Sequence, residues 1–132
     1  MIAALVGLAP ALLPNPAAAI AGTVAVLQGL DKITARVSTF EAPISKPVRF
    51  GTLEITVRYC DRAPPEDPPE SAAFLDIREI KVGSTTPVEL FQGWMFASSP
   101  ALSALEHPVY DVWVLECRTP KASSTSKSPK SK

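Results

Sequence analysis

The chain has 132 residues, enough for one domain, and 46% of them are hydrophobic, so it can bury a core. Its thirteen basic and thirteen acidic residues cancel. However, residues 119–132 hold four lysines and no acid, which leaves nine basic and thirteen acidic residues, a net charge of −4, in the rest. This mildly acidic part argues against a nucleic-acid-binding surface built on a basic face.

The N-terminal segment predicts an export signal. No charged residue precedes Asp31. The apolar run Ile2–Leu13 is followed by small residues at 17–19, the pattern of a secretory signal with cleavage after Ala19. The run is shorter than the ~20 residues that a membrane-spanning helix needs. We therefore expect residues 1–19 to be a cleaved signal, the protein to be periplasmic, and no stable membrane insertion after cleavage.

After the signal, the pattern is that of β-strands. Residues 23–28 (TVAVLQ) and 33–40 (ITARVSTF) predict two strands joined by a turn over GLDK. Residues 53–60 (LEITVRYC) alternate most strictly, which predicts one buried and one solvated face. The buried face is expected to carry Leu53, Ile55, Val57 and Tyr59.

The second half of the chain continues in the same way. The proline-rich segment 62–71 is expected to stay outside the sheets, and residues 72–82 form the next strand with Leu75 and Ile77 inward. Residues 88–97 (VELFQGWMFA) and 110–117 (YDVWVLEC) are apolar on both faces, which predicts central strands. Residues 119–132 lack apolar periodicity and predict a disordered tail.

Six or seven short strands without a long amphipathic helix predict an all-β domain over residues 20–118, either a small antiparallel sandwich or a barrel. Cys60 and Cys117 each end a predicted strand, and an even cysteine count in an exported chain predicts one disulfide. A redox-active pair would be a CxxC beside a helix N-terminus, a pattern that the sequence lacks.

Three stretches, LQGLDKITARVSTFE, VRFGTLEITVRYC and GWMFASSPALSALEHPVYDVWVLEC, resemble a family of small secreted bacterial proteins catalogued as domain of unknown function 2155. The resemblance covers residues 24–118, and the last stretch is its most distinctive part. It implies an envelope protein of Gram-negative bacteria with paired cysteines and no assigned activity. It carries over no catalytic residue.

His107, the chain's only histidine, is the one candidate general base. The enzymatic alternative is a hydrolase in which Ser98, Ser99 or Ser103 joins His107 and Asp111, but no G-x-S-x-G elbow supports it. We expect His107 to be a structural histidine that bonds to loop backbone. One histidine with disulfide-bound cysteines cannot supply the three or four ligands of a zinc site. A metal is therefore not expected, and because no nucleotide-binding motif is present, no cofactor is expected either.

Aromatic residues gather between Phe91 and Trp113. Most should be core, but the segment GWMFASSPALSAL can turn apolar groups outward as a protein-binding patch. We therefore expect a non-enzymatic binding or accessory module of the cell envelope with a protein partner. A carbohydrate- or peptidoglycan-binding module with an exposed aromatic platform is the remaining alternative. The predicted contact residues are Trp94, Met95, Phe96, Leu102, Leu105 and His107.

Overall fold

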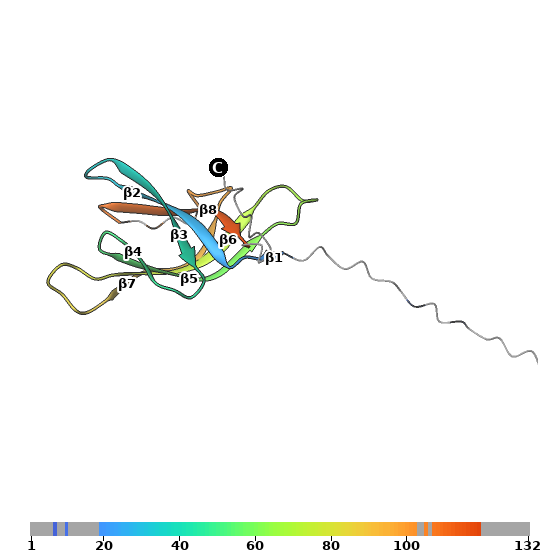
Figure 1. The fold of residues 1–132 in the computed structure, drawn as a ribbon, viewed down its shortest axis with the longest axis horizontal. Coiled ribbons are helices and arrows are strands. Elements are labelled where there is room, and N and C mark those ends of the chain that lie inside the picture. The colour runs from blue at the N-terminus through green and yellow to red at the C-terminus, as the bar shows by residue number, and fades with distance from the viewer. Residues whose placement is uncertain (1–6, 8–9, 11–18, 103–104, 106, 120–132) are drawn as a thin grey trace, which may run out of the picture.

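The computed structural model describes residues 7, 10, 19–102, 105 and 107–119. Within these residues the chain forms eight strands and no helix. The strands build two antiparallel sheets that lie face to face (Figure 1). The all-β prediction is confirmed, and of the two architectures left open the fold is a sandwich, because the sheets keep separate edges instead of closing into a barrel.

The larger sheet has five strands in the order β1-β5-β6-β7, with β4 also paired to β5. Its central strands are long enough to cross the whole sandwich, whereas β1 and β4 are short additions at one edge. Their bounds are β1 (Ile20–Ala21), β4 (Val48–Phe50), β5 (Leu53–Arg62), β6 (Ser71–Glu79) and β7 (Val88–Phe96).

The smaller sheet has the order β3-β2-β8, with β2 (Val24–Asp31), β3 (Arg36–Pro43) and β8 (Tyr110–Arg118). The strand predicted over 33–40 begins three residues later than expected. Asp31 Oδ1 accepts the backbone N–H groups of Ile33 and Thr34, at 2.9 and 3.1 Å, and this turn ends β2. Residues 32–35 therefore form the turn, and Ile33 is exposed.

The core lies between the sheets and follows the predicted alternation in most places. Leu53, Ile55 and Val57 on β5 and Leu75 and Ile77 on β6 are fully buried, as predicted. They face the inward residues of the smaller sheet, which are Ala25, Leu27, Ala42, Val112 and Val114. The prediction for Tyr59 is wrong, because the β5–β6 register shifts between Val57 and Tyr59 and turns Tyr59 to the outer face.

The two strands predicted to be central lie at sheet edges. Among the described residues, β7 pairs with β6 alone and β8 with β2 alone. Their sequences are apolar on both faces for a different reason. The outward side chains of β7 include Trp94 and Phe96, and that of β8 includes Leu115, all of which are exposed.

The connection between β7 and β8, residues 97–109, is called the return segment below. Both strands run from the Glu79 end of β6 toward its Ser71 end, so this segment must lead back along the sandwich. The Ala97 N–H donates to the Ser71 carbonyl at 2.8 Å at one end. His107 Nε2 lies 2.8 Å from Glu79 Oε2 at the other end.

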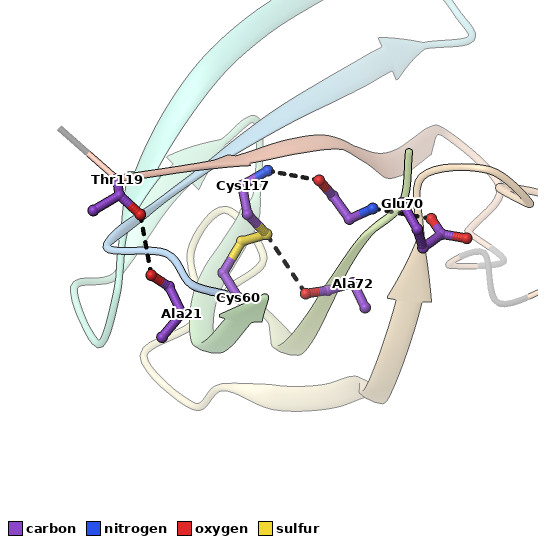
Figure 2. The surroundings of a disulfide bond; sticks show 7 residues. Ala21, Cys60, Glu70, Ala72, Cys117 and Thr119 are labelled. Atoms are coloured by element: carbon purple, nitrogen blue, oxygen red, sulfur yellow. Dashed lines mark hydrogen bonds between the residues drawn. A yellow bond between two sulfur atoms is a disulfide. The ribbon is translucent and has the colours of Figure 1, made fainter. Parts of the chain in front are cut away.

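The predicted disulfide between Cys60 and Cys117 is present, and it ties the two sheets together. Figure 2 shows that it joins β5 of the larger sheet to β8 of the smaller one. The Cys117 N–H donates to Ser71 Oγ at 3.1 Å, and the Ser71 N–H donates to Glu70 Oε1 at 3.0 Å. The Thr119 hydroxyl donates to the Ala21 carbonyl, which fixes the last described residue beside β1.

Two of the predicted segments fall largely outside the described residues. The signal over residues 1–19 is described at residues 7, 10 and 19 alone, and the tail over 119–132 at Thr119 alone. Both stay predictions. No helix among the described residues is long and apolar enough to cross a membrane.

Candidate functional site

The predicted contact segment divides into surface and core residues. Trp94 and Phe96 point to the outer face of β7 and are each 39% exposed, and Leu102 in the return segment is 81% exposed. The prediction is wrong for Met95 and Leu105, which are 2% exposed and belong to the core. Met95 alternates with its two exposed neighbours along the strand, so it must face inward.

An aromatic row crosses the outer face of the larger sheet, made of Tyr59, Phe74 and Trp94. The registers pair Tyr59 with Phe74 and Phe74 with Trp94. Tyr59 stacks on Trp94 with ring centroids 6.4 Å apart and an interplanar angle of 20°. The Phe74 ring meets Trp94 edge-on at 5.6 Å. Tyr59 is 64% exposed, so the row faces solvent and not the core.

Two further rows lie beside the aromatic row on the same face. The next register step aligns Thr56, Asp76 and Gln92, and the one after it aligns Glu54, Arg78 and Glu89. Arg58, the extra residue of the β5 bulge, reaches Asp76 Oδ2 at 3.4 Å. Arg78 lies 3.8 Å from Glu54. The outer face thus changes from aromatic to charged within two register steps.

Asp76 and Glu89 are the electrostatically unusual pair of this face. Asp76 is 8% exposed, and its Oδ1 atom is covered and has no hydrogen-bond partner among the described residues. The neighbouring Asp76 carboxyl, together with burial, raises the pKa of the Glu89 carboxyl above its ordinary value. Arg78 and Arg58 oppose this rise without cancelling it. Glu89 therefore keeps its proton to a higher pH than an isolated glutamate does.

His107 is held by contacts on both ring nitrogens. Nδ1 accepts the backbone N–H groups of Val109 and Tyr110 at 3.0 and 3.2 Å, which places the ring proton on Nε2. Nε2 donates to Glu79 Oε2 at 2.8 Å. The ring also stacks on Tyr110 at 5.3 Å. His107 therefore bonds to loop backbone, as expected, and neither nitrogen is left to accept a proton from a substrate.

Glu79 anchors this end of the return segment. Burial raises the pKa of its carboxyl, but the hydrogen bonds from Thr52 and His107 outweigh burial and the net pKa is lowered. The Thr52 hydroxyl donates to Oε2 at 2.9 Å. Both Glu79 and the histidine ring are nearly buried, at 9% and 10% side-chain exposure. The pair joins β6 to the chain entering β8.

The hydrolase constellation does not come together among the described residues. The Ser98 hydroxyl and N–H both donate to Glu70, next to the first residue of β6, and these bonds lower the pKa of Glu70. His107 is anchored at the opposite end of β6. The nine residues of β6 separate those ends by about 26 Å at ~3.3 Å per residue. Ser103 lies outside the described residues.

A hollow of about 510 Å³ opens beside His107 and is also lined by Lys32, Asp111 and Trp113. Asp111 pairs with Lys32 at 2.8 Å instead of orienting the histidine. The hollow therefore contains a closed ion pair and a fully bonded imidazole. Within the part of the chain that the structure describes, no three histidine, cysteine or carboxylate side chains are grouped to hold a metal ion.

Sequence reasoning found Trp94 and Phe96 but missed Tyr59, Phe74, Asp76 and Glu89. The strict alternation of residues 53–60 predicted a buried Tyr59, and no residue type in this strand indicates a β-bulge. Asp76 alternates with the inward Leu75 and Ile77, but its proximity to Glu89 follows from the β6–β7 register, which the sequence does not specify.

Comparison with known proteins gives a family without an assigned role. Residues 25–117 match the family model described as "Uncharacterized protein conserved in bacteria (DUF2155)". An uncharacterized protein of Rickettsia prowazekii (strain Madrid E) is 32% identical over 88 residues, which cover 67% of this chain and 56% of that relative. The chain thus spans little more than half the length of the relative. No solved structure matches.

Proposed function

The chain belongs to the DUF2155 family of proteins conserved in bacteria, and on that premise we propose that it is a non-catalytic binding or accessory module of the cell envelope. Its partner is a protein, bound on the outer face of the larger sheet. The observation that carries this proposal is the aromatic row Tyr59–Phe74–Trp94, which no described residue covers.

Exposing an aromatic row to water is unfavourable, and a bound partner would remove that exposure. Aromatic side chains are the largest contributors to interface energy, and a contiguous exposed cluster on a soluble domain marks an interaction site more often than chance exposure does. Phe96 extends the row at the next register step, opposite Ala72. Because these side chains lie on the outer face, the core between the sheets does not account for them.

The proposed compartment is the periplasm. The Cys60–Cys117 disulfide supports export, because such bonds persist in oxidising compartments and are rare in the cytosol. The signal-like segment 1–19 is consistent with the same route. The burial of individual side chains changes the contact surface that was predicted from the sequence. Trp94 and Phe96 remain in it, and the buried Met95 and Leu105 do not belong to it.

The test is site-specific photocrosslinking in the native host. A benzoylphenylalanine placed at Tyr59 should give a discrete crosslinked product, whereas the same group at Val37, an exposed position on β3 of the smaller sheet, should not. With the identified partner purified, Trp94→Ala should weaken binding about thirtyfold, the ~2 kcal/mol loss of an interface hot spot. Val37→Ala should leave binding unchanged. Equal crosslinking from both positions would refute the proposed face.

An NMR titration tests the alternative of a glycan partner. A chitin oligosaccharide should not perturb the Trp94 indole signal in NMR spectra of the full chain, because Phe74 meets that ring edge-on and the row offers no flat, open platform on which a sugar ring could stack. Saturable perturbation by the oligosaccharide would replace the protein partner with a carbohydrate-binding function.

A further inference from the structure

The charged part of the outer face is short of one positive charge. Three carboxylates, from Glu54, Asp76 and Glu89, stand among two guanidinium groups, from Arg58 and Arg78. Arg78 lies 3.8 Å from Glu54, and Arg58 lies 3.4 Å from Asp76 Oδ2. Among these five groups, Glu89 is the carboxyl without a matching cation.

The unpaired position is marked by a second observation. Asp76 is 8% exposed, yet its Oδ1 accepts no hydrogen bond from the described residues. A buried carboxylate oxygen without a donor is rare and unfavourable. The raised pKa of Glu89 agrees with this geometry, since its main cause is the neighbouring Asp76 carboxyl. In the free protein a proton on Glu89 can satisfy Asp76, and a positively charged group can take its place.

We propose that an arginine side chain of the partner protein binds between Glu89 and Asp76, with its stem along the aromatic row. This inference rests on the proposed function and names the chemistry that the outer face recognises. Phe74 and Asp76 are two residues apart on one face of β6, so the aromatic and acidic parts of the site lie about 7 Å apart. An arginine stem can cover that distance along the surface.

Arginine fits both halves of this site. Its planar guanidinium donates to carboxylates through a fork of N–H groups and also stacks on aromatic rings. Trp94 is the ring type that attracts cations best, and it is exposed on the strand that also carries Glu89. Glu89 lies on β7, an edge strand of the larger sheet, so a partner can approach it from the side.

Because the arginine replaces the proton on Glu89, its binding depends on pH. The charged and titratable groups that face Glu89 are Asp76 and Arg78 from β6 and Arg58 from β5, with Glu54 beyond Arg78. Arginine binding requires the ionised form of Glu89, so below the raised pKa of that carboxyl binding must release its proton. Affinity should therefore rise as the pH rises through the raised pKa of Glu89 and become constant above it.

The experiment uses NMR spectra of the ¹⁵N-labelled full chain titrated with N-acetyl-arginine amide at constant ionic strength. N-acetyl-citrulline amide, which has nearly the same shape and no charge, is the control probe. We expect the arginine probe to shift the Trp94 indole signal and the Asp76 and Gln92 amides saturably, with an affinity about fivefold above that of the citrulline probe, the size of one exposed cation–π or ionic contact. The advantage should grow as the pH rises above the ordinary glutamate value of 4.5.

Glu89→Gln is the decisive variant. Glutamine can still donate to Asp76, so the fold is kept, but the site loses its charge. The arginine probe should then bind about as weakly as the citrulline probe and independently of pH. Glu41→Gln removes an exposed acid from β3 of the smaller sheet and should leave both effects intact.

Equal binding of the two probes, or an unchanged pH dependence in Glu89→Gln, would overturn the arginine site. That failure is separable from failure of the proposed function. Suppose that Tyr59 crosslinks to a partner and that Glu89→Gln does not change the affinity for that partner. The outer face is then the binding face, but the arginine site is wrong. If Tyr59 gives no crosslink above the Val37 background, the face itself is wrong.

Discussion

Replacing His107 separates the two sets of contacts that this residue makes. In His107→Ala all of them are lost: the bond to Glu79, the two backbone N–H bonds and the stacking on Tyr110. In His107→Asn the side-chain oxygen can still accept the N–H two residues on, as asparagine does in turns. The shorter side chain does not reach Glu79. The pair of variants therefore partitions the histidine's contribution to stability.

The expected losses follow from the contacts. A hydrogen bond to a charged, nearly buried carboxylate contributes about 1.5–3 kcal/mol, and each neutral one about 1 kcal/mol. His107→Ala should thus lower the free energy of unfolding by about 4 kcal/mol and His107→Asn by about 2 kcal/mol. A domain of this size has a total of about 5–15 kcal/mol, so the alanine variant should be visibly destabilised at room temperature.

The assay is equilibrium urea unfolding followed by circular dichroism, with Glu79→Gln as the second arm of a double-mutant cycle. In the Glu79→Gln background the effect of His107→Ala should shrink, because the charged contact is already gone. An alanine variant as stable as the wild type would refute the structural role. His107 would then be free to serve in chemistry, and the hydrolase reading would regain its central residue.

Three other outcomes follow from the structure. Replacing Cys60 and Cys117 together by serine should lower the free energy of unfolding by about 4 kcal/mol in urea titrations, the chain-entropy value for a separation of 57 residues; an unchanged midpoint would show that the tie between the sheets is dispensable. Gly29→Ala should cost about 1–3 kcal/mol in the same titration, because its added methyl would lie 2.6 Å from the nearest ring carbon of a phenylalanine on β4. The lowered pKa values of Glu70 and Glu79 mean that their stabilisation is present above the ordinary glutamate range, about pH 4.3, and is lost as the pH falls through the folded values. Thermal midpoints should therefore fall between pH 5 and pH 3, and Glu79→Gln should flatten that fall.

Local alternation is the part of the fold that the sequence specifies most directly. Leu53, Ile55, Leu75 and Ile77 were placed inward from period-two patterns, and each is fully buried. The disulfide followed from the cysteine count and the expected compartment, which need no knowledge of strand order. These inferences succeed because each depends on residues close in sequence or on chemistry that is independent of topology.

The aromatic row shows where such reasoning ends. In a regular strand Tyr59 would share the face of Val57, and Cys60 would point to solvent. The single extra residue of the bulge, Arg58, exchanges the two faces, so that Cys60 reaches Cys117 and Tyr59 reaches Trp94. A bulge depends on the pairing register with the neighbouring strand, and that register is a property of the assembled sheet. The aromatic row and the inward position of Cys60 therefore have one common origin that the sequence pattern conceals.

The return segment contributes one buried leucine, Leu105, to the core. β7 and β8 run in the same direction, so the segment between them joins the Ser71 end of β6 to its Glu79 end, and Leu105 packs in the core on the way. Leu105→Ala should therefore cost about 2–5 kcal/mol in urea unfolding, as buried leucines do. Leu102, a leucine of the same segment that is 81% exposed, should change stability by less than about 0.5 kcal/mol when truncated. Equal small effects would mean that the core closes without Leu105, and the apolar inner face of β8 would then need another cover.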